Sequence, residues 1–303
     1  MTTVLFLGAL EIGLIYALVA LGVLISFRIL DFPDLTADGS FPLGGAVCAV
    51  CIINGVNPWV ATILATFAGA MAGFVTAWLH VSLKILQLLA SILVMLALYS
   101  VNLRIMGSPN VSLLGEPIIY DTWAGDNFET LRYWQPLMAL GFVIVGKLFL
   151  DWFFNTQTGL AVRATGANAR MAKAQGISTG KMVFLGMAIS NGLIALGGAL
   201  YVQSQGGVDM SIGVGTIVIG LAAVIIGETL IPSKNIVVIT LAVVIGSILY
   251  RFFIAIALSS DTLREIGFRA QDLNLVTALL VVLVLVAPQI KAKMLARGKG
   301  MPS

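Results

Sequence analysis

The sequence predicts an all-α, polytopic integral membrane protein with about eight or nine transmembrane helices, some of them broken or re-entrant. Of its 303 residues, 59% are hydrophobic and only 10% are charged, and the mean hydropathy is +1.03. Soluble globular chains carry about 25% charged residues. The apolar runs are long and do not alternate with polar residues, which excludes the strands of a membrane barrel.

Apolar runs long enough for membrane helices follow one another along the whole chain, so we expect a single membrane domain over residues 1–303. The first run has no basic segment before it and no small-residue cleavage site after it, so it is expected to be retained. The expected spans are Val4–Phe27, Phe41–Ile53, Pro58–Leu79, Ile85–Met106, Trp134–Phe154, Val183–Gln203, Val214–Leu230, Ile236–Leu258 and Leu273–Pro288.

The distribution of charge predicts the orientation, because basic connections stay in the cytoplasm. The connection over about residues 155–182 and the tail over residues 289–303 carry basic residues and no acid, so both are expected to be cytoplasmic. The connections near residues 116–132 and 261–272 contain several acids and are expected outside. Counting an odd number of spans back from a cytoplasmic tail places Met1 outside.

The first interruption is the segment Asp31–Gly45, which is rich in Pro, Gly and Asp between two apolar runs. Proline removes a backbone donor and glycine permits unusual dihedral angles, so a simple continuous helix is not expected here. Irregular backbone at membrane depth survives only where protein or water covers it. An ordinary polar loop is the alternative. The candidates for the solute pathway are Asp34, Thr36, Asp38, Gly39 and Ser40.

The second interruption is Gly206–Gly220, which is rich in glycine and opens the seventh span. Its Asp209-Met210-Ser211 aligns with Asp34-Leu35-Thr36, which suggests an internal repeat of the kind that places broken helices at a substrate route. Close helix packing through small residues is the alternative, and it is the role expected of Gly69 and Gly73. The pathway candidates in this segment are Asp209, Ser211, Gly213 and Gly215.

In the connection over residues 155–182, Ala164, Asn168 and Ala172 are four residues apart, the spacing of side chains on one face of a helix. A short basic helix is expected over Ala169–Gln175, with Gly176 as its stop. Structured loops of this kind often bind partners, whereas the plain alternative is a solvated positive loop.

Ionisable residues inside apolar runs are functional candidates, because burying a charge in a membrane is costly. Glu11 is the open case, since it lies within the first span. Glu228 and Arg251 are expected to reach an interface. Cys48 and Cys51 are expected to be structural, and the single histidine, His80, has no converging partners for metal or acid–base chemistry, so no metal site is predicted.

The connection over residues 155–182 contains Gly159-Leu160, Arg163-Ala164-Thr165-Gly166, Asn168, Ala172 and Gly176-Ile177. This pattern resembles the coupling loop of the permease family of ABC importers for branched-chain amino acids, ribose and related solutes. Gly13 to Leu18, the DLTADGS segment and Gly206–Thr229 also resemble that family, so that the similarity covers most of the chain in order. DLTADGS and Asp209-Met210-Ser211 look closer to an amino-acid subgroup, branched-chain or aromatic, than to the sugar permeases.

The resemblance implies a division of work among subunits. A separate ATPase dimer would bind ATP, a second permease subunit, identical or a sister chain, would complete the pathway, and an external binding protein would deliver solute. It also implies a multi-pass protein of the bacterial cytoplasmic membrane, surrounded by lipid. The chain has no G-x-x-x-x-G-K-[ST] motif, so no ATP hydrolysis and no bound cofactor are expected of it. The resemblance implies that the residues in contact with the ATPase are Arg163, Asn168, Arg170, Met171, Lys173 and Gly176.

Other classes of protein fit the sequence less well. An ion-coupled secondary transporter or channel would need paired carboxylates deep in the membrane, and Glu11 is the best candidate that the chain offers. A membrane enzyme would need a nucleophile with a base or a metal cluster. The net charge of +3 gives no reason to expect a nucleic-acid partner.

Overall fold

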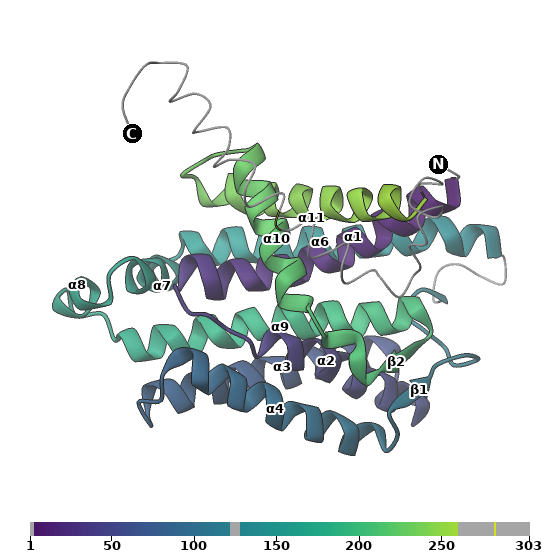
Figure 1. Ribbon diagram of the computed structural model, residues 1–303, viewed down its shortest axis with the longest axis horizontal. Helices are drawn as coiled ribbons and strands as arrows, with labels where there is room; N and C mark the ends of the chain where they lie inside the picture. The colour runs from purple at the N-terminus through teal and green to yellow at the C-terminus, as the bar shows by residue number, and fades with distance from the viewer. Residues whose placement is uncertain (1–2, 122–127, 260–281, 283–303) are drawn as a thin grey trace.

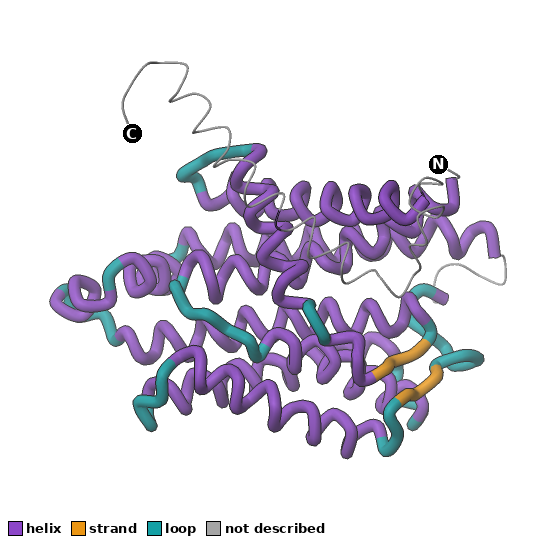
Figure 2. The backbone as a smooth tube through the Cα atoms, viewed as in Figure 1, coloured by secondary structure: helices purple, strands orange, loops and turns teal. Residues whose placement is uncertain are grey.

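The computed structural model describes residues 3–121, 128–259 and 282, and these fold into a helical bundle with two short strands at one end (Figures 1 and 2). Among the described residues, 7 helices are long and apolar enough to cross a membrane, which confirms the predicted polytopic all-α class. The bounds are α1 Thr3–Val23 continuing as the π-helix η1 Leu24–Ile29, α2 Ala37–Ile53, α3 Pro58–Val81, α4 Gln87–Met106, β1 Asn110–Ser112, α6 Phe128–Asn155, α7 Gln157–Ala167, α8 Ala169–Ala174, α9 Thr179–Gln205, β2 Gly207–Asp209, the 3-10 turn η2 Met210–Gly213, α10 Thr216–Leu230 and α11 Ile236–Ser259.

The predicted spans agree with these helices, with two informative shifts at the interrupted segments. The helix expected from Phe41 starts four residues earlier, at Ala37, because Asp38, Gly39 and Ser40 form its first turn. The seventh span consists of the short turn η2 followed by α10, which begins at Thr216. The predicted span Leu273–Pro288 and the tail 289–303 lie outside the described residues, apart from Val282.

Helix α9 lies in the middle of the bundle, where it packs against α1, α2 and α3 (Figure 1). Small residues allow this close packing. A Cβ on Gly69 would lie 2.2 Å from the Cβ of Ala195, and one on Gly73 would lie 2.2 Å from the carbonyl oxygen of Met187. The packing role predicted for these two glycines is therefore confirmed.

The strands β1 and β2 pair antiparallel, with Val111 opposite Val208. They fix the chain just before η2 at the end of the bundle opposite α7 and α8 (Figure 2). Met210 N–H also donates to the carbonyl oxygen of Pro109 at 3.1 Å, so the start of η2 is anchored to the α4–β1 connection.

The order of long helix, interrupted segment and long helix occurs twice, at α1–α3 and at α9–α11. The two sets run in opposite directions. Helix α1 runs toward the α7–α8 end and α9 runs away from it, while α2 leads away from that end and α10 leads toward it (Figure 1). This arrangement is that of an inverted repeat, and it supports the internal repeat inferred from the sequence.

Candidate functional site

The two interrupted segments meet at Asp38, in the first turn of α2. Its Oδ1 accepts a hydrogen bond of 2.8 Å from the N–H of Ile217, and its Oδ2 accepts one of 3.3 Å from the N–H of Gly215. These N–H groups belong to the start of α10, where backbone donors have no partner within the helix and the helix dipole favours a negative charge. One carboxylate thus joins the starts of both helices.

The two aligned tripeptides adopt the same local turn. Asp34 Oδ1 accepts from the N–H of Thr36 at 3.0 Å, and Asp209 Oδ1 accepts from the N–H of Ser211 at 2.7 Å. In each case an aspartate bonds the backbone two residues ahead, just before a helix begins. Hydrogen bonds from the hydroxyl and backbone N–H of Ser211 also lower the pKa of Asp209, so this carboxyl is ionised at neutral pH. The shared geometry supports the alignment of the two segments.

The first segment is tied to α9 by a buried network around Asn191. The Asn191 Nδ2 donates to Asp34 Oδ2 at 2.7 Å, and its Oδ1 accepts from the hydroxyl of Ser40 at 2.7 Å. The hydroxyls of Thr36 and Thr76 lie 2.8 Å apart. Asp34, Thr36 and Ser40 are therefore held inside the protein, and their part in the pathway stays a prediction.

A cavity of about 480 Å³ opens beside Asp38, between α2, α4 and η2. Of the predicted pathway residues, it brings together Asp38, Gly39, Asp209, Ser211 and Gly213. Gly215 does not line it, but holds Asp38 through its N–H. Helix α4 supplies lining residues that the sequence reading missed, namely Met95, Leu96, Tyr99 and Asn102. The available signal was a polar side chain, Asn102, within an apolar run.

The two pathway glycines serve different purposes. A Cβ on Gly213 would lie 2.1 Å from the backbone oxygen of Asp38, so only glycine permits this approach of η2 to α2. Gly215 has φ +83°, a left-handed conformation at the N-cap of α10, and a Cβ there would meet nothing within 4 Å. Gly213 is needed for space and Gly215 for its backbone dihedral angle.

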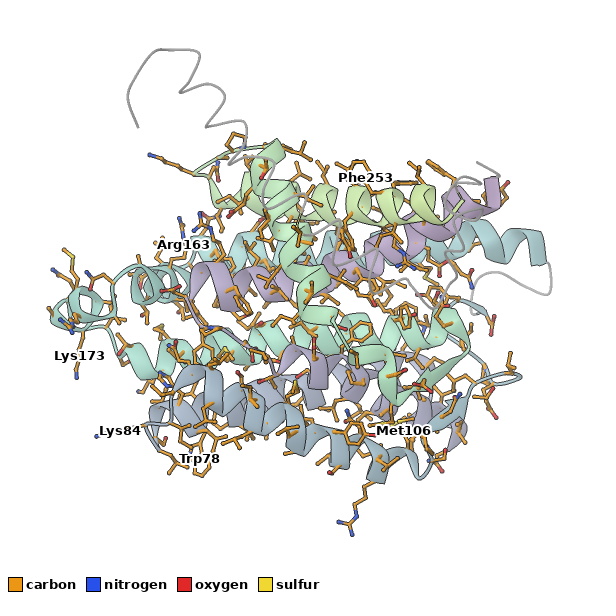
Figure 3. All side chains as sticks on the ribbon, viewed as in Figure 1. Trp78, Lys84, Met106, Arg163, Lys173 and Phe253 are labelled. Atoms are coloured by element: carbon orange, nitrogen blue, oxygen red, sulfur yellow. The ribbon has the colours of Figure 1, made fainter. Side chains whose placement is uncertain are left out.

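The connection between α6 and α9 projects from one end of the bundle as α7 and α8, with Arg163 and Lys173 at that end (Figure 3). The predicted short basic helix is confirmed as α8, and Gly176, with φ +84°, stops it. Asn168 caps α8 by accepting from the N–H of Met171 at 3.0 Å. The side chains of Arg170, Met171 and Lys173 are exposed and Arg163 is half-buried.

A second cavity, of about 970 Å³, lies between α7, η1 and the α10–α11 connection, and Arg163 lines it. At its wall, Arg28 Nε pairs with Glu228 Oε1 at 2.7 Å. Glu228 lies near the end of α10, and the ion pair connects that end to η1. That Glu228 reaches a membrane interface stays a prediction. Glu11 is buried in α1, where its Oε1 accepts from the hydroxyl of Ser204 at 2.5 Å. Arg251 is half-buried in α11.

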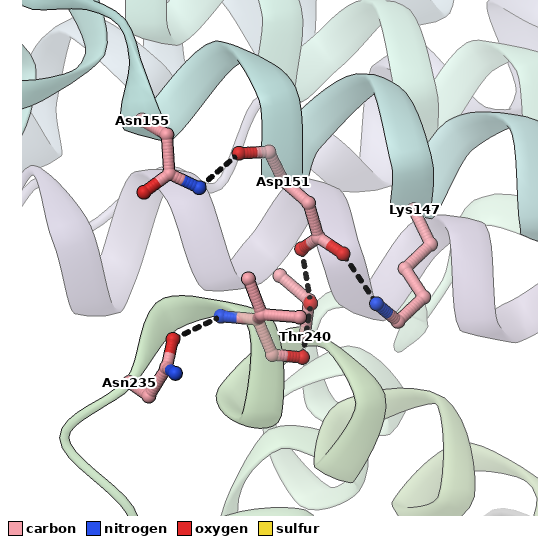
Figure 4. Close-up of polar contacts among 6 residues, drawn as sticks. Lys147, Asp151, Asn155, Asn235 and Thr240 are labelled. Carbon is pink, nitrogen blue, oxygen red and sulfur yellow. Dashed lines mark hydrogen bonds and ion pairs between the residues drawn. The ribbon is translucent and has the colours of Figure 1, made fainter.

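Two further intramembrane charges, Lys147 and Asp151 of α6, escaped the sequence reading (Figure 4). They form an ion pair with side-chain exposures of 17% and 11%, and Asp151 Oδ1 accepts from the hydroxyl of Thr240 in α11 at 2.6 Å. The spacing of four residues on one helix was the signal that could have revealed the pair.

The cysteines and the histidine have structural contacts. Cys48 is buried and its Sγ accepts from Gln203 Nε2 at 3.2 Å, while His80 Nδ1 lies 2.8 Å from the carbonyl oxygen of Ile85 at the end of α3. Over the described residues, no group of three or more His, Cys, Asp or Glu side chains is placed to hold a metal ion.

Comparison with known proteins gives consistent results. Residues 5–287 match the family described as branched-chain amino acid transport system / permease component. The chain is 42% identical over 271 residues to the tyrosine transport system permease protein of Clostridioides difficile strain R20291, covering 89% of this chain and 86% of that protein. It is 26% identical over 197 residues to the ribose import permease protein RbsC of Escherichia coli strain K12, covering 65% and 60%. The solved structure of PsaBC from Streptococcus pneumoniae in complex with Fab shares the fold, with a TM-score of 0.51 at 16% identity, and covers 92% of this chain and 89% of that one.

Proposed function

Because the chain belongs to the ABC transporter permease family of branched-chain amino acid transport systems, we propose that it forms the membrane pathway of an ATP-driven importer for an amino acid, with an aromatic amino acid as the preferred solute. The wide match to a tyrosine transport permease supports the choice of solute. The more distant similarity to a ribose permease extends over a smaller part of the chain.

The observation that carries this proposal is the meeting of two interrupted helices beside a cavity that two carboxylates, Asp38 and Asp209, line. A transport pathway needs irregular backbone and polar groups inside the bundle, together with joints that can change their packing. Asp38 holds the start of α10 against α2 through hydrogen bonds from two backbone N–H groups, and Gly213 allows the two backbones to touch. Ala37 and Phe41 of α2 also pack with Ile217 of α10, so the contact between the two segments is partly apolar.

The ATPase acts at the opposite end of the protein, where α7 and α8 lie. An ATPase dimer contacts the exposed face of α8, formed by Arg170, Met171 and Lys173, and its closure moves α7 and α8 against η1 and α10. A second permease subunit completes the pathway and an external binding protein delivers the solute. The protein lies in the bacterial cytoplasmic membrane, with α7, α8 and the C-terminal tail in the cytoplasm.

The test is purification of the tagged protein from its native membrane in mild detergent, with mass spectrometry of the proteins that accompany it. We expect an ATPase and a second permease subunit, and we expect that complex in liposomes to import tyrosine only with ATP and the binding protein. Ion-driven uptake by the chain alone would contradict the proposal. It would favour a secondary transporter, with Glu11 as the first residue to mutate.

A further inference from the structure

Helix α11 carries a single charged residue, Arg251, inside an apolar span that lies along α1 (Figure 1). Among the described residues this side chain has no ion pair and no hydrogen bond. A charge within a membrane span is costly, so such a residue is a candidate for a functional role. Arg251 is half-buried, which leaves part of its surface open to a ligand.

The position of Arg251 on α11 is the face that meets α1. A Cβ on Gly13 of α1 would lie 3.4 Å from the Cβ of Arg251. The sequence predicts that Arg251 reaches a membrane interface, but the base of its side chain is packed against the neighbouring helix. What the guanidinium meets therefore depends on where the side chain leads from there.

The antiparallel course of α1 and α11 leads the side chain deeper into the bundle. Phe6 of α1 packs on Phe252 with ring centroids 5.0 Å apart, whereas Gly13 packs on Ile248, so the two helices run in opposite directions. A helical side chain leans toward the N-terminus of its own helix. The guanidinium of Arg251 thus leans from the level of Gly13 toward the residue one turn further along α1.

That residue is Tyr16, which belongs to a cluster of three aromatic rings. Its ring centroid lies 5.6 Å from that of Phe41 in α2 and 6.0 Å from that of Tyr201 in α9, and the latter two are 5.6 Å apart. We call Tyr16, Phe41 and Tyr201 the aromatic cluster. The positive charge of Arg251 lies close enough to act on both tyrosines.

The groups gathered here suit a carboxylate that is part of a zwitterion. A guanidinium binds a carboxylate through two parallel N–H···O bonds. Tyr201 is half-buried and its hydroxyl has no hydrogen bond among the described residues, so it can add a further donor. The charge of Asp38 also acts on Tyr16, so both signs of charge surround the aromatic cluster. The rings offer a surface for an aromatic side chain.

We propose that Arg251 binds the carboxylate of the transported amino acid, with the hydroxyl of Tyr201 as a second donor. This proposal rests on the proposed amino-acid import and adds a site that orients the solute within the pathway. The carboxylate lies against α11, and the side chain of the solute lies against the aromatic cluster.

The first test uses the whole importer in liposomes, with its ATPase and binding protein, and measures the tyrosine imported per ATP hydrolysed. Arg251→Gln removes the charge and keeps a polar side chain, and Tyr201→Phe removes only the hydroxyl. Phe253→Leu, at an exposed position of the same helix, is the control (Figure 3). Arg251→Gln is expected to lower import per ATP at least about tenfold, because hydrogen bonds to a charged group are lost.

Tyr201→Phe should give a smaller loss in the same direction, and Phe253→Leu should match the unmodified protein. Stimulation of ATP hydrolysis by the binding protein should stay normal, because α8 is unchanged. Unchanged import per ATP in Arg251→Gln would overturn the carboxylate site while leaving amino-acid import intact. An unmodified complex that imports no amino acid would overturn the proposed function itself, and the carboxylate site with it.

The second test needs no variant and no binding protein. It measures thermal unfolding of the purified complex in detergent with tyrosine or with tyramine, which lacks the carboxylate. Tyrosine is expected to raise the unfolding temperature more than tyramine does, because a ligand stabilises the folded state that binds it. Equal effects of the two compounds overturn the carboxylate site. Arg251→Gln should erase the difference, and a variant that unfolds at a lower temperature but keeps the difference would give Arg251 a purely structural role.

Discussion

Asn191 shows how one side chain can hold an interrupted helix in place. Its amide donates to Asp34 and to the carbonyl oxygen of Met187, and it accepts from Ser40. All of these side chains are buried, so water cannot replace a lost partner. The Pro- and Gly-rich segment marks Asp34 and Ser40 in the sequence. Asn191 is a polar side chain within an apolar run, but only the packing of α9 against α2 shows that it meets these two residues.

Replacing Asn191 with Leu is therefore expected to destabilise the fold by about 3 kcal/mol, since it removes the Nδ2 donor from the buried Asp34 carboxyl and the acceptor from Ser40. Thermal unfolding in detergent measures the effect. Thr66→Val is the matched control, because the Thr66 hydroxyl bonds only the Thr62 carbonyl of its own helix. Equal stability of the two variants would show that the Asn191 network contributes little.

At the scale of single elements, η2 and the start of α10 depend on glycines with different physical roles. Gly213→Ala places a methyl group against the backbone of Asp38, so η2 must separate from α2. We expect this variant to lose nearly all uptake. Gly215→Asn meets no neighbour, and asparagine tolerates the left-handed conformation, so most uptake should remain.

Both glycine variants should still purify with the ATPase, since α7 and α8 lie at the other end of the bundle (Figure 1). Uptake assays of the two purified complexes measure the difference. Full uptake by Gly213→Ala would show that Gly213 contributes only to helix packing and not to transport.

Helix α8 is a short element with two exposed basic side chains, Arg170 and Lys173. Reversing both charges, Arg170→Glu with Lys173→Glu, is expected to prevent recovery of the ATPase while the chain stays inserted and folded, because both side chains are exposed. Affinity purification measures the ATPase recovered. Lys84→Glu is the control, since Lys84 is exposed at the same end in the α3–α4 turn (Figure 3). Normal ATPase recovery with the double variant would contradict the coupling role of α8.

On the scale of the whole molecule, the pair Lys147–Asp151 and Thr240 join α6 to α11, so the helix leading into α7 is tied to the second half of the repeat. Removing one member of a buried ion pair leaves an uncompensated charge, whereas removing both leaves none. Lys147→Met is expected to cost about 3 kcal/mol of stability.

The double variant Lys147→Met with Asp151→Leu should regain most of that loss. Thermal unfolding of the single and double variants forms the test. A double variant that is less stable than Lys147→Met alone would mean that the Asp151–Thr240 bond contributes more than the ion pair.

The sequence by itself determined the class, the family and most element bounds of this protein. Apolar runs of sufficient length must form helices in lipid, and Pro, Gly and Asp clusters must interrupt them. The same local chemistry identified α8, its Gly176 stop and the aligned Asp34 and Asp209 turns. These features depend on residues that are close together in the chain.

Only the tertiary structure decided which side chains share a site. Asp38 meets Gly215 and Ile217, and Asn102 meets Gly39, across separations of 63 to 179 residues. It also separated the buried Asp34, Thr36 and Ser40 from the cavity-lining Asp38 and Asp209, although they occur in similar sequence segments. The reason is physical: in an apolar chain, periodicity shows that a helix crosses the membrane but not which of its neighbours each face meets.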